Sequence, residues 1–150
     1  RVCFVCLGNI CRSPMAAALL RHHCRSHPRG GDWVIDSCGT GGWHVGNPAD
    51  PRTVATLGRH GVAIEHRARQ LRRGDYDDFD LLLGMDQNNL AILGDRAPRG
   101  GHRARIDLLG SFDPDGVREV GDPYYGDDDG FERIFAQLDR ACRALLEQHA

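Results

Sequence analysis

Residues 2–14 read VCFVCLGNICRSP, which is a short apolar run, a polar loop and the start of a segment rich in alanine and leucine. This order predicts a strand, a loop and a helix. We expect Ser13 to cap the helix and Pro14 to lie in its first turn, because a serine oxygen accepts from free amides and proline needs no partner there. Backbone amides at a helix N-terminus favour an anion. The loop is therefore predicted to bind phosphate.

Two side chains of this loop carry reactive chemistry. Cys6 ends the strand, and the positive field of the loop favours its nucleophilic thiolate form. Arg12 has a planar guanidinium that can bind two oxygens of a phosphoryl group in the transition state. Gly8 and Asn9 are the residues expected to adopt positive backbone angles. The pattern predicts transfer of a phosphoryl group to sulfur.

The loop resembles the Cys-x5-Arg-Ser signature of the low-molecular-weight protein tyrosine phosphatases, and the resemblance extends from Val2 to about His149. It implies hydrolysis of phosphotyrosine through a cysteinyl-phosphate intermediate on Cys6, with Arg12 binding the phosphoryl group. It further implies that Cys11 forms a reversible disulfide with Cys6, which protects the nucleophile from irreversible oxidation. The loop residues expected to bind substrate are Leu7, Gly8, Asn9, Ile10, Cys11 and Ser13, and Ser13 is expected to donate to the sulfur.

A second motif, Gly-Asp-Pro-Tyr-Tyr-Gly, lies at residues 121–126. Alone, it predicts a turn. Beside a cysteine nucleophile, Asp122 can protonate the leaving phenolate and then activate water. The resembling family carries its general acid in a matching segment, which makes Asp122 the expected catalytic acid and base. Tyr124 and Tyr125 are then expected to wall the pocket and stack on an aromatic substrate.

Three further residues match the family but have alternative interpretations. Trp43 corresponds to the aromatic residue at the pocket mouth, or else it is a half-buried loop residue without a substrate role. His66 corresponds to a histidine that hydrogen-bonds the loop asparagine, here Asn9, or else it is solvent-exposed. Asp86 follows an apolar run and either caps a helix or lies near the phosphate loop. It is not expected to be catalytic.

The alternation of apolar and amphipathic segments predicts an α/β fold. We expect a single-domain, open, parallel four-stranded sheet flanked by helices, with the phosphate-binding loop between the first strand and the first helix. No repeat or linker divides the chain, so residues 1–150 are predicted to form one phosphatase domain. The expected strands are 2–5, 33–36, 79–83 and 105–109, and the expected helices are 14–26, 51–61, 86–94 and 130–148. Apolar residues at helical spacing in the last helix are Ile134, Phe135, Leu138, Ala141, Cys142, Leu145 and Leu146.

Composition sets limits on partners and cofactors. The formal net charge of −2 gives no reason to expect nucleic acid or membrane binding, and no apolar run approaches transmembrane length. All 19 basic residues are arginine, which excludes a Walker-type phosphate loop and Schiff-base chemistry. The six cysteines contain no Cys-x2-Cys pair, so neither a metal nor a cofactor is expected. The acidic run 127–129 is expected to be a solvated loop.

The expected compartment is the reducing cytoplasm, since no secretory signal is seen, although a chain that starts at Arg1 without methionine leaves a short missing leader open. The expected partners are phosphotyrosine-containing proteins, and the chain is expected to be a monomer. The remaining cysteines are predicted to be small core residues, namely Cys3, Cys24, Cys38 and Cys142.

Alternative functions remain open on the sequence. A thioredoxin-coupled arsenate reductase would need further cysteines downstream to relay a disulfide, and this chain has none between Cys38 and Cys142. A phosphotyrosine-binding module or redox sensor would not need an acid at Asp122. Within the phosphatases, a sister group that acts on phosphoarginine tends to carry threonine where this chain has Ile10. A β-branched apolar residue there favours the phenyl ring of phosphotyrosine.

Overall fold

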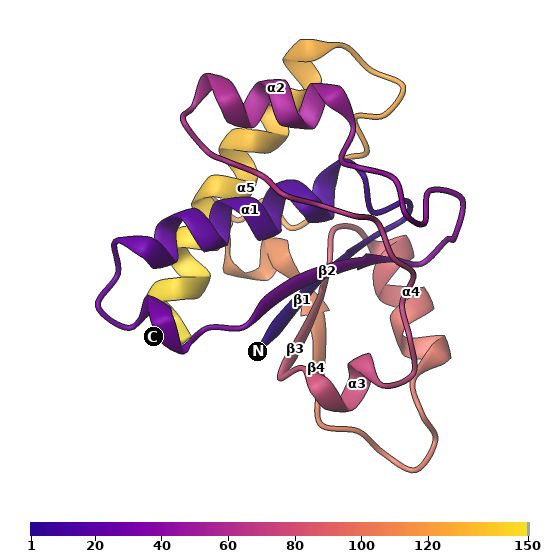
Figure 1. Cartoon of the computed structure of the whole chain (residues 1–150). Helices are drawn as coiled ribbons and strands as arrows, with labels where there is room; N and C mark the ends of the chain where they lie inside the picture. The colour runs from indigo at the N-terminus through magenta and orange to yellow at the C-terminus, as the bar shows by residue number, and fades with distance from the viewer. Residues whose placement is uncertain (150) are drawn as a thin grey trace.

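The computed structural model describes residues 1–149 and contains a four-stranded, all-parallel sheet in the order β2-β1-β3-β4 (Figure 1). β1 is Val2–Cys6, β2 is Ile35–Gly39, β3 is Leu81–Gly84 and β4 is Arg105–Leu108. β1 lies in the interior and pairs with both β2 and β3. Because all strands are parallel, their carboxyl ends share one edge of the sheet, where ligands bind in folds of this kind. The predicted α/β fold is confirmed.

Helices cover both faces of the sheet (Figure 1). α1 and α5 pack on one face, with α2 against α5, whereas α3 and α4 cover the other. The bounds are Arg12–Arg25 for α1, Pro51–Arg59 for α2, Asp75–Asp78 for α3, Gln87–Arg96 for α4 and Asp128–His149 for α5. Two short 3-10 helices, at Gly30–Asp32 and Leu109–Phe112, complete the secondary structure of the described residues.

Both faces of β1 are buried, and its side chains alternate between two cores. Val2, Phe4 and Cys6 belong to the core under α1 and α5, whereas Cys3 and Val5 belong to the smaller core under α3 and α4. None of the five is more than 2% exposed. This two-sided burial explains why β1 is continuously apolar, and it gives the following loop a rigid base.

The start of α1 differs from the prediction. The helix begins at Arg12, and Cys11 is its N-cap residue without a side-chain cap. The predicted cap role of Ser13 is wrong, because its hydroxyl is bonded to Cys6 and Asn9 instead. Pro14 does lie in the first turn, where its missing N–H costs nothing.

Other elements also begin or end at residues that differ from the prediction. β2 starts at Ile35 and runs to Gly39, later than the predicted 33–36, and α3 was not predicted. The acidic run 127–129 is not entirely a loop, because α5 begins at Asp128. Carboxylates in a first helical turn interact favourably with the helix dipole, which explains why an acidic sequence can start this helix.

The predicted core is largely confirmed. The four cysteines expected there are buried, and so are the apolar residues of α5 apart from the half-buried Phe135. Among residues 1–149, no helix combines the length and apolar character needed to cross a membrane.

Candidate active site

The loop after β1 lines a cavity of about 340 Å³. Trp43, from the loop after β2, and the segment 122–125, which precedes α5, border the same cavity. Every predicted site residue lines it except Asn9 and Ser13, which are fully buried. His44 is the one lining residue that the sequence analysis did not single out, although it adjoins Trp43. The fold thus brings three distant parts of the chain to the carboxyl edge of the sheet.

Asn9 fastens the loop to its surroundings. It is fully buried, and its Oδ1 accepts from the Arg69 backbone N–H at 3.0 Å. Because that N–H can only donate, the amide orientation is fixed, and Nδ2 donates to Ser13 Oγ at 2.8 Å and Ser37 Oγ at 2.9 Å. The Asn9 carbonyl accepts from His66 Nε2 at 2.6 Å. The predicted His66–Asn9 hydrogen bond is therefore confirmed, with the backbone as acceptor.

The backbone angles of the loop agree only in part with the prediction. Asn9 has φ 58°, as expected, whereas Gly8 does not lie in the positive region. Gly8 is instead a place of close approach, since a Cβ there would lie 3.1 Å from the His44 ring. Glycine at this position lets the His44 side chain reach the cavity wall.

Two donors are directed at the sulfur of Cys6. The Asn9 N–H donates to Sγ at 3.3 Å, and Ser13 Oγ lies 2.9 Å from it. Since Ser13 Oγ already accepts from Asn9, its own hydrogen is free to point at the sulfur, so we assign Ser13 as the donor. Both hydrogen bonds stabilise negative charge on sulfur, as a nucleophilic thiolate requires.

The loop also offers free amides on the cavity side. The backbone N–H groups of Leu7, Gly8, Ile10 and Cys11 have no hydrogen-bond partner among residues 1–149, whereas that of Asn9 is used by the sulfur. These four residues all line the cavity, and unpaired donors in such a concave loop form a site for an anion.

Arg12 is fixed by groups outside the loop. Its Nη1 donates to the Asp86 carboxylate at 2.6 Å and to the Val120 carbonyl at 2.9 Å, while Nη2 lies 3.7 Å from Asp122 Oδ2. Burial opposes the charge of this side chain, but Cys6 and Asp86 outweigh it and raise the pKa of Arg12. The guanidinium is therefore charged and held at the cavity before any substrate binds.

Asp86 has both of the roles considered for it in the sequence, because it caps a helix and also lies near the phosphate loop. Its side chain accepts from the Asn89 N–H at 2.8 Å and caps α4, while its other oxygen holds Arg12. A single carboxylate thus starts a helix and orients the guanidinium.

The aromatic residues border the cavity mouth. Trp43 is 73% exposed and Tyr125 is 95% exposed, so neither is packed into the protein, and the half-buried alternative for Trp43 is wrong. Tyr124 is half-buried and meets Tyr125 edge-to-face with 4.9 Å between ring centroids. Asp122 Oδ1 accepts from the Tyr124 N–H at 3.0 Å, which forms the turn that the sequence predicts.

Cys11 lines the same cavity as Cys6 and is almost fully buried. Burial, together with nearby Asp50, raises the pKa of Cys11 to about 12. It is therefore a neutral thiol near pH 7. The cysteines are free in this structure, and residues 1–149 contain no cluster of histidine, cysteine and acidic side chains that could hold a metal ion.

Comparison with known proteins covers the whole chain. The family model described as low molecular weight phosphotyrosine protein phosphatase matches residues 1–150. The chain belongs to this family. A low molecular weight phosphotyrosine protein phosphatase from Sus scrofa is 45% identical over 148 residues, which cover 98% of this chain and 94% of the relative. The resemblance noted in the sequence is confirmed.

Solved structures agree with the family assignment. A protein tyrosine phosphatase from Entamoeba histolytica, with Hepes in its active site, has a TM-score of 0.93 and 34% identity, and the match covers 98% of this chain and 94% of that one. An arginine phosphatase from Drosophila has a TM-score of 0.92 and 34% identity, with 99% and 97% covered. The chain is therefore an enzyme of the low molecular weight protein tyrosine phosphatase type.

The environment of His66 predicts a pH-dependent stability. Burial lowers the pKa of His66 below its ordinary 6.5, and the hydrogen bond to Asn9 offsets this only in part. The unfolded chain therefore binds this proton more readily, so the stabilisation is complete above about pH 6.5 and is lost as the pH falls through the lowered folded-state pKa.

We expect the free energy of unfolding to fall as the pH is lowered from 7 to 5, and to fall less steeply in His66→Gln. Glutamine can still donate to the Asn9 carbonyl, but it does not titrate. Urea unfolding at several pH values measures both slopes. Equal slopes for the two proteins would contradict the assigned role of His66.

Proposed function

We propose that the enzyme hydrolyses phosphotyrosine in proteins through a cysteinyl-phosphate intermediate. One observation carries the proposal, namely that Cys6, Arg12 and Asp122 meet at a single cavity beside the unpaired backbone amides of the loop. The sulfur has two donors to stabilise its charge, and the Arg12 guanidinium lies 3.7 Å from the Asp122 carboxylate. Nucleophile, anion site and acid are thus assembled together.

In the first step, the Cys6 thiolate attacks phosphorus and the bond from phosphorus to the tyrosine oxygen breaks. Asp122, protonated at this stage, gives its proton to the leaving phenolate. Arg12 and the loop amides hold the three equatorial oxygens as the phosphoryl group flattens. The products are dephosphorylated tyrosine and a phosphate ester of sulfur.

In the second step, water attacks the phosphorus on Cys6, and the Asp122 carboxylate takes a proton from that water. The sulfur–phosphorus bond breaks, inorganic phosphate leaves and the thiolate is restored. Ser13 stabilises the departing sulfur through the contact at 2.9 Å. The same residue therefore acts as acid and then as base.

The remaining expectations belong to this proposal. We assign residues 1–150 to one catalytic domain that acts as a monomer in the cytoplasm on phosphotyrosine-containing proteins, without nucleic acid, membrane or cofactor. The net charge of −2 supports the absence of a polyanionic partner. The mouth residues Trp43, Tyr124 and Tyr125 supply aromatic surface suited to a phenyl ring.

Cys11 is proposed to protect the nucleophile during oxidation. Peroxide would oxidise the Cys6 thiolate to a sulfenic acid, and the Cys11 sulfur would then displace water to form a disulfide. Cys11 lines the same cavity, and its raised pKa keeps it from competing with Cys6 as the first target. A thiol reductant restores both groups.

The first prediction from this proposal concerns the nucleophile. Cys6→Ser should reduce hydrolysis to below a few per cent of wild type while inorganic phosphate still binds, because an alcohol is a poor nucleophile but Arg12 and the amides remain. Steady-state kinetics and calorimetric phosphate titration measure the two properties. Cys24→Ser, at a buried cysteine of α1 away from the cavity, is the matched control and should keep activity. Substantial turnover by Cys6→Ser would contradict the assignment.

The second prediction concerns the acid. Asp122→Ala should slow hydrolysis of a phosphotyrosine peptide by roughly 100-fold or more, but affect 4-nitrophenyl phosphate much less, since nitrophenolate leaves without a proton. Asp129→Ala, which removes an exposed carboxylate in the first turn of α5 outside the cavity lining, is the control. Equal losses on both substrates would mean that Asp122 only shapes the turn.

The third prediction separates phosphotyrosine from phosphoarginine, because the Drosophila structure is named an arginine phosphatase. Ile10 lines the cavity and is 8% exposed, so it offers an apolar contact that leaves a guanidino group unpaired. We expect kcat/KM to favour the phosphotyrosine peptide, and Ile10→Thr to shift the ratio toward phosphoarginine. Wild-type preference for phosphoarginine would refute the proposed pocket.

A further inference from the structure

Arg52, in the first turn of α2, makes contacts that the proposed reaction does not use. Its Nε and Nη2 bind the Asp50 carboxylate at 3.0 and 2.9 Å in a bidentate pair. Asp50 is the N-cap of α2, and its side chain is 8% exposed. The hydrogen bonds from Arg52 lower the pKa of Asp50, so this pair remains ionised at neutral pH. The guanidinium is thus held in one orientation.

The same guanidinium reaches the segment that carries Asp122. Nη2 donates to the Tyr124 carbonyl at 2.9 Å, and Nη1 donates to the Gly126 carbonyl at 3.3 Å. Its Cζ also lies 4.6 Å from the ring centroid of Phe131, just inside α5. Among residues 1–149, the hydrogen bonds that reach segment 121–126 from outside it come from Arg52.

Asp50 connects this contact to the phosphate loop. Its backbone N–H donates to the Ile10 carbonyl at 2.8 Å. On the other side, the Tyr124 carbonyl accepts from Arg52, and the N–H of the same residue donates to Asp122 Oδ1. Hydrogen bonds, joined through the covalent frameworks of Asp50 and Tyr124, therefore connect the phosphate loop to the carboxylate of Asp122.

Segment 121–126 needs such an anchor. It contains no helix or strand, and the Asp122 side chain is 41% exposed. Proton transfer to a leaving oxygen requires the acid within hydrogen-bond distance, and small displacements of a catalytic group are costly.

We propose that Arg52 is a positioning residue that sets the place of Asp122 relative to Cys6. The inference rests on the proposed role of Asp122 as general acid and names the residue that holds this acid in place. Arg52 does not touch the reacting atoms, because it acts on the backbone of residues 124 and 126. Replacement of Arg52 should therefore change the kinetics in the same direction as replacement of Asp122, but to a smaller extent.

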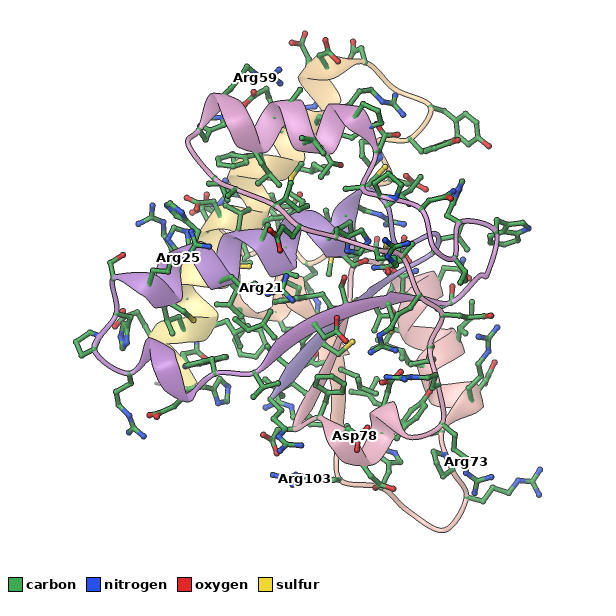
Figure 2. All side chains as sticks on the ribbon, viewed as in Figure 1. Arg21, Arg25, Arg59, Arg73, Asp78 and Arg103 are labelled. Carbon is green, nitrogen blue, oxygen red and sulfur yellow. The ribbon has the colours of Figure 1, made fainter. Side chains whose placement is uncertain are left out.

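The chain offers a matched control on the same helix. Arg59, at the other end of α2, also joins this helix to α5, through Glu132 at 2.9 Å. Figure 2 shows Arg59 at the end of α2 remote from the segment that precedes α5. Arg59→Ala therefore removes an ion pair between the same two helices without touching segment 121–126.

The experiment measures kcat/KM of Arg52→Ala, Arg52→Lys and Arg59→Ala on a phosphotyrosine peptide and on 4-nitrophenyl phosphate. Arg52→Ala should lower the peptide value by roughly tenfold and the nitrophenyl value by less than about threefold. Arg52→Lys should be intermediate, because an ammonium cannot bind Asp50 in a bidentate manner. Arg59→Ala should leave both values near wild type.

A double variant tests whether Arg52 acts through Asp122. In the Asp122→Ala background, Arg52→Ala should cause no further loss on the peptide, and competitive inhibition by inorganic phosphate should stay unchanged in the single variant. Equal losses on both substrates, or independent losses that multiply in the double variant, would overturn the positioning role. Urea unfolding of each variant identifies any loss of activity that is caused by instability. If Arg52→Ala proves unstable, the kinetics of the folded Arg52→Lys variant decide whether Arg52 positions Asp122.

The two proposals fail in different ways. If Asp122→Ala shows no selectivity between the substrates, the general acid assignment fails and the role of Arg52 falls with it. If Asp122→Ala is selective and Arg52→Ala is not, only the positioning inference is overturned.

Discussion

The left-handed backbone of Asn9 is the constraint on which the site depends. A non-glycine residue in this conformation costs about 1–3 kcal/mol, so the surroundings must hold it there. They do so through both ends of the side-chain amide and through the carbonyl, which are bonded to Arg69, Ser13, Ser37 and His66. The turn at this residue directs its own N–H at the sulfur and leaves the neighbouring amides free. Glycine could adopt the same angle but would lose all of the side-chain hydrogen bonds.

The sequence predicted the fold well where burial was two-sided or strongly periodic. β1 is apolar throughout because both its faces are covered, and α5 buries a stripe at helical spacing. The prediction failed at β2, whose apolar-looking start at Trp33 and Val34 lies outside the strand. The strand continues instead into Ser37 and Gly39, which are buried against the phosphate loop and give no apolar signal in the sequence.

For the site as for the fold, some features could be predicted from sequence motifs and others are visible only in the structure. Cys6, Arg12 and Asp122 lie in compact motifs whose residue types match a chemistry, so the sequence alone was enough to predict roles for them. The contacts of Arg52 could not be predicted, because any residue type can supply the backbone carbonyls to which this arginine donates. His44 reaches the cavity because Gly8 has no side chain, and this close approach is visible only in three dimensions.

The hydrogen bond from Arg12 to the Val120 carbonyl joins residues 108 positions apart. The Val120 carbonyl thus holds the guanidinium from a distant part of the chain, together with the Asp86 carboxylate, which accepts from the same Nη1. Contacts of such long sequence separation form late in folding, because closing the intervening chain carries an entropic cost. Until Arg12 and Val120 have met, the chain contains the phosphate loop but lacks one of the two groups that hold the guanidinium in place.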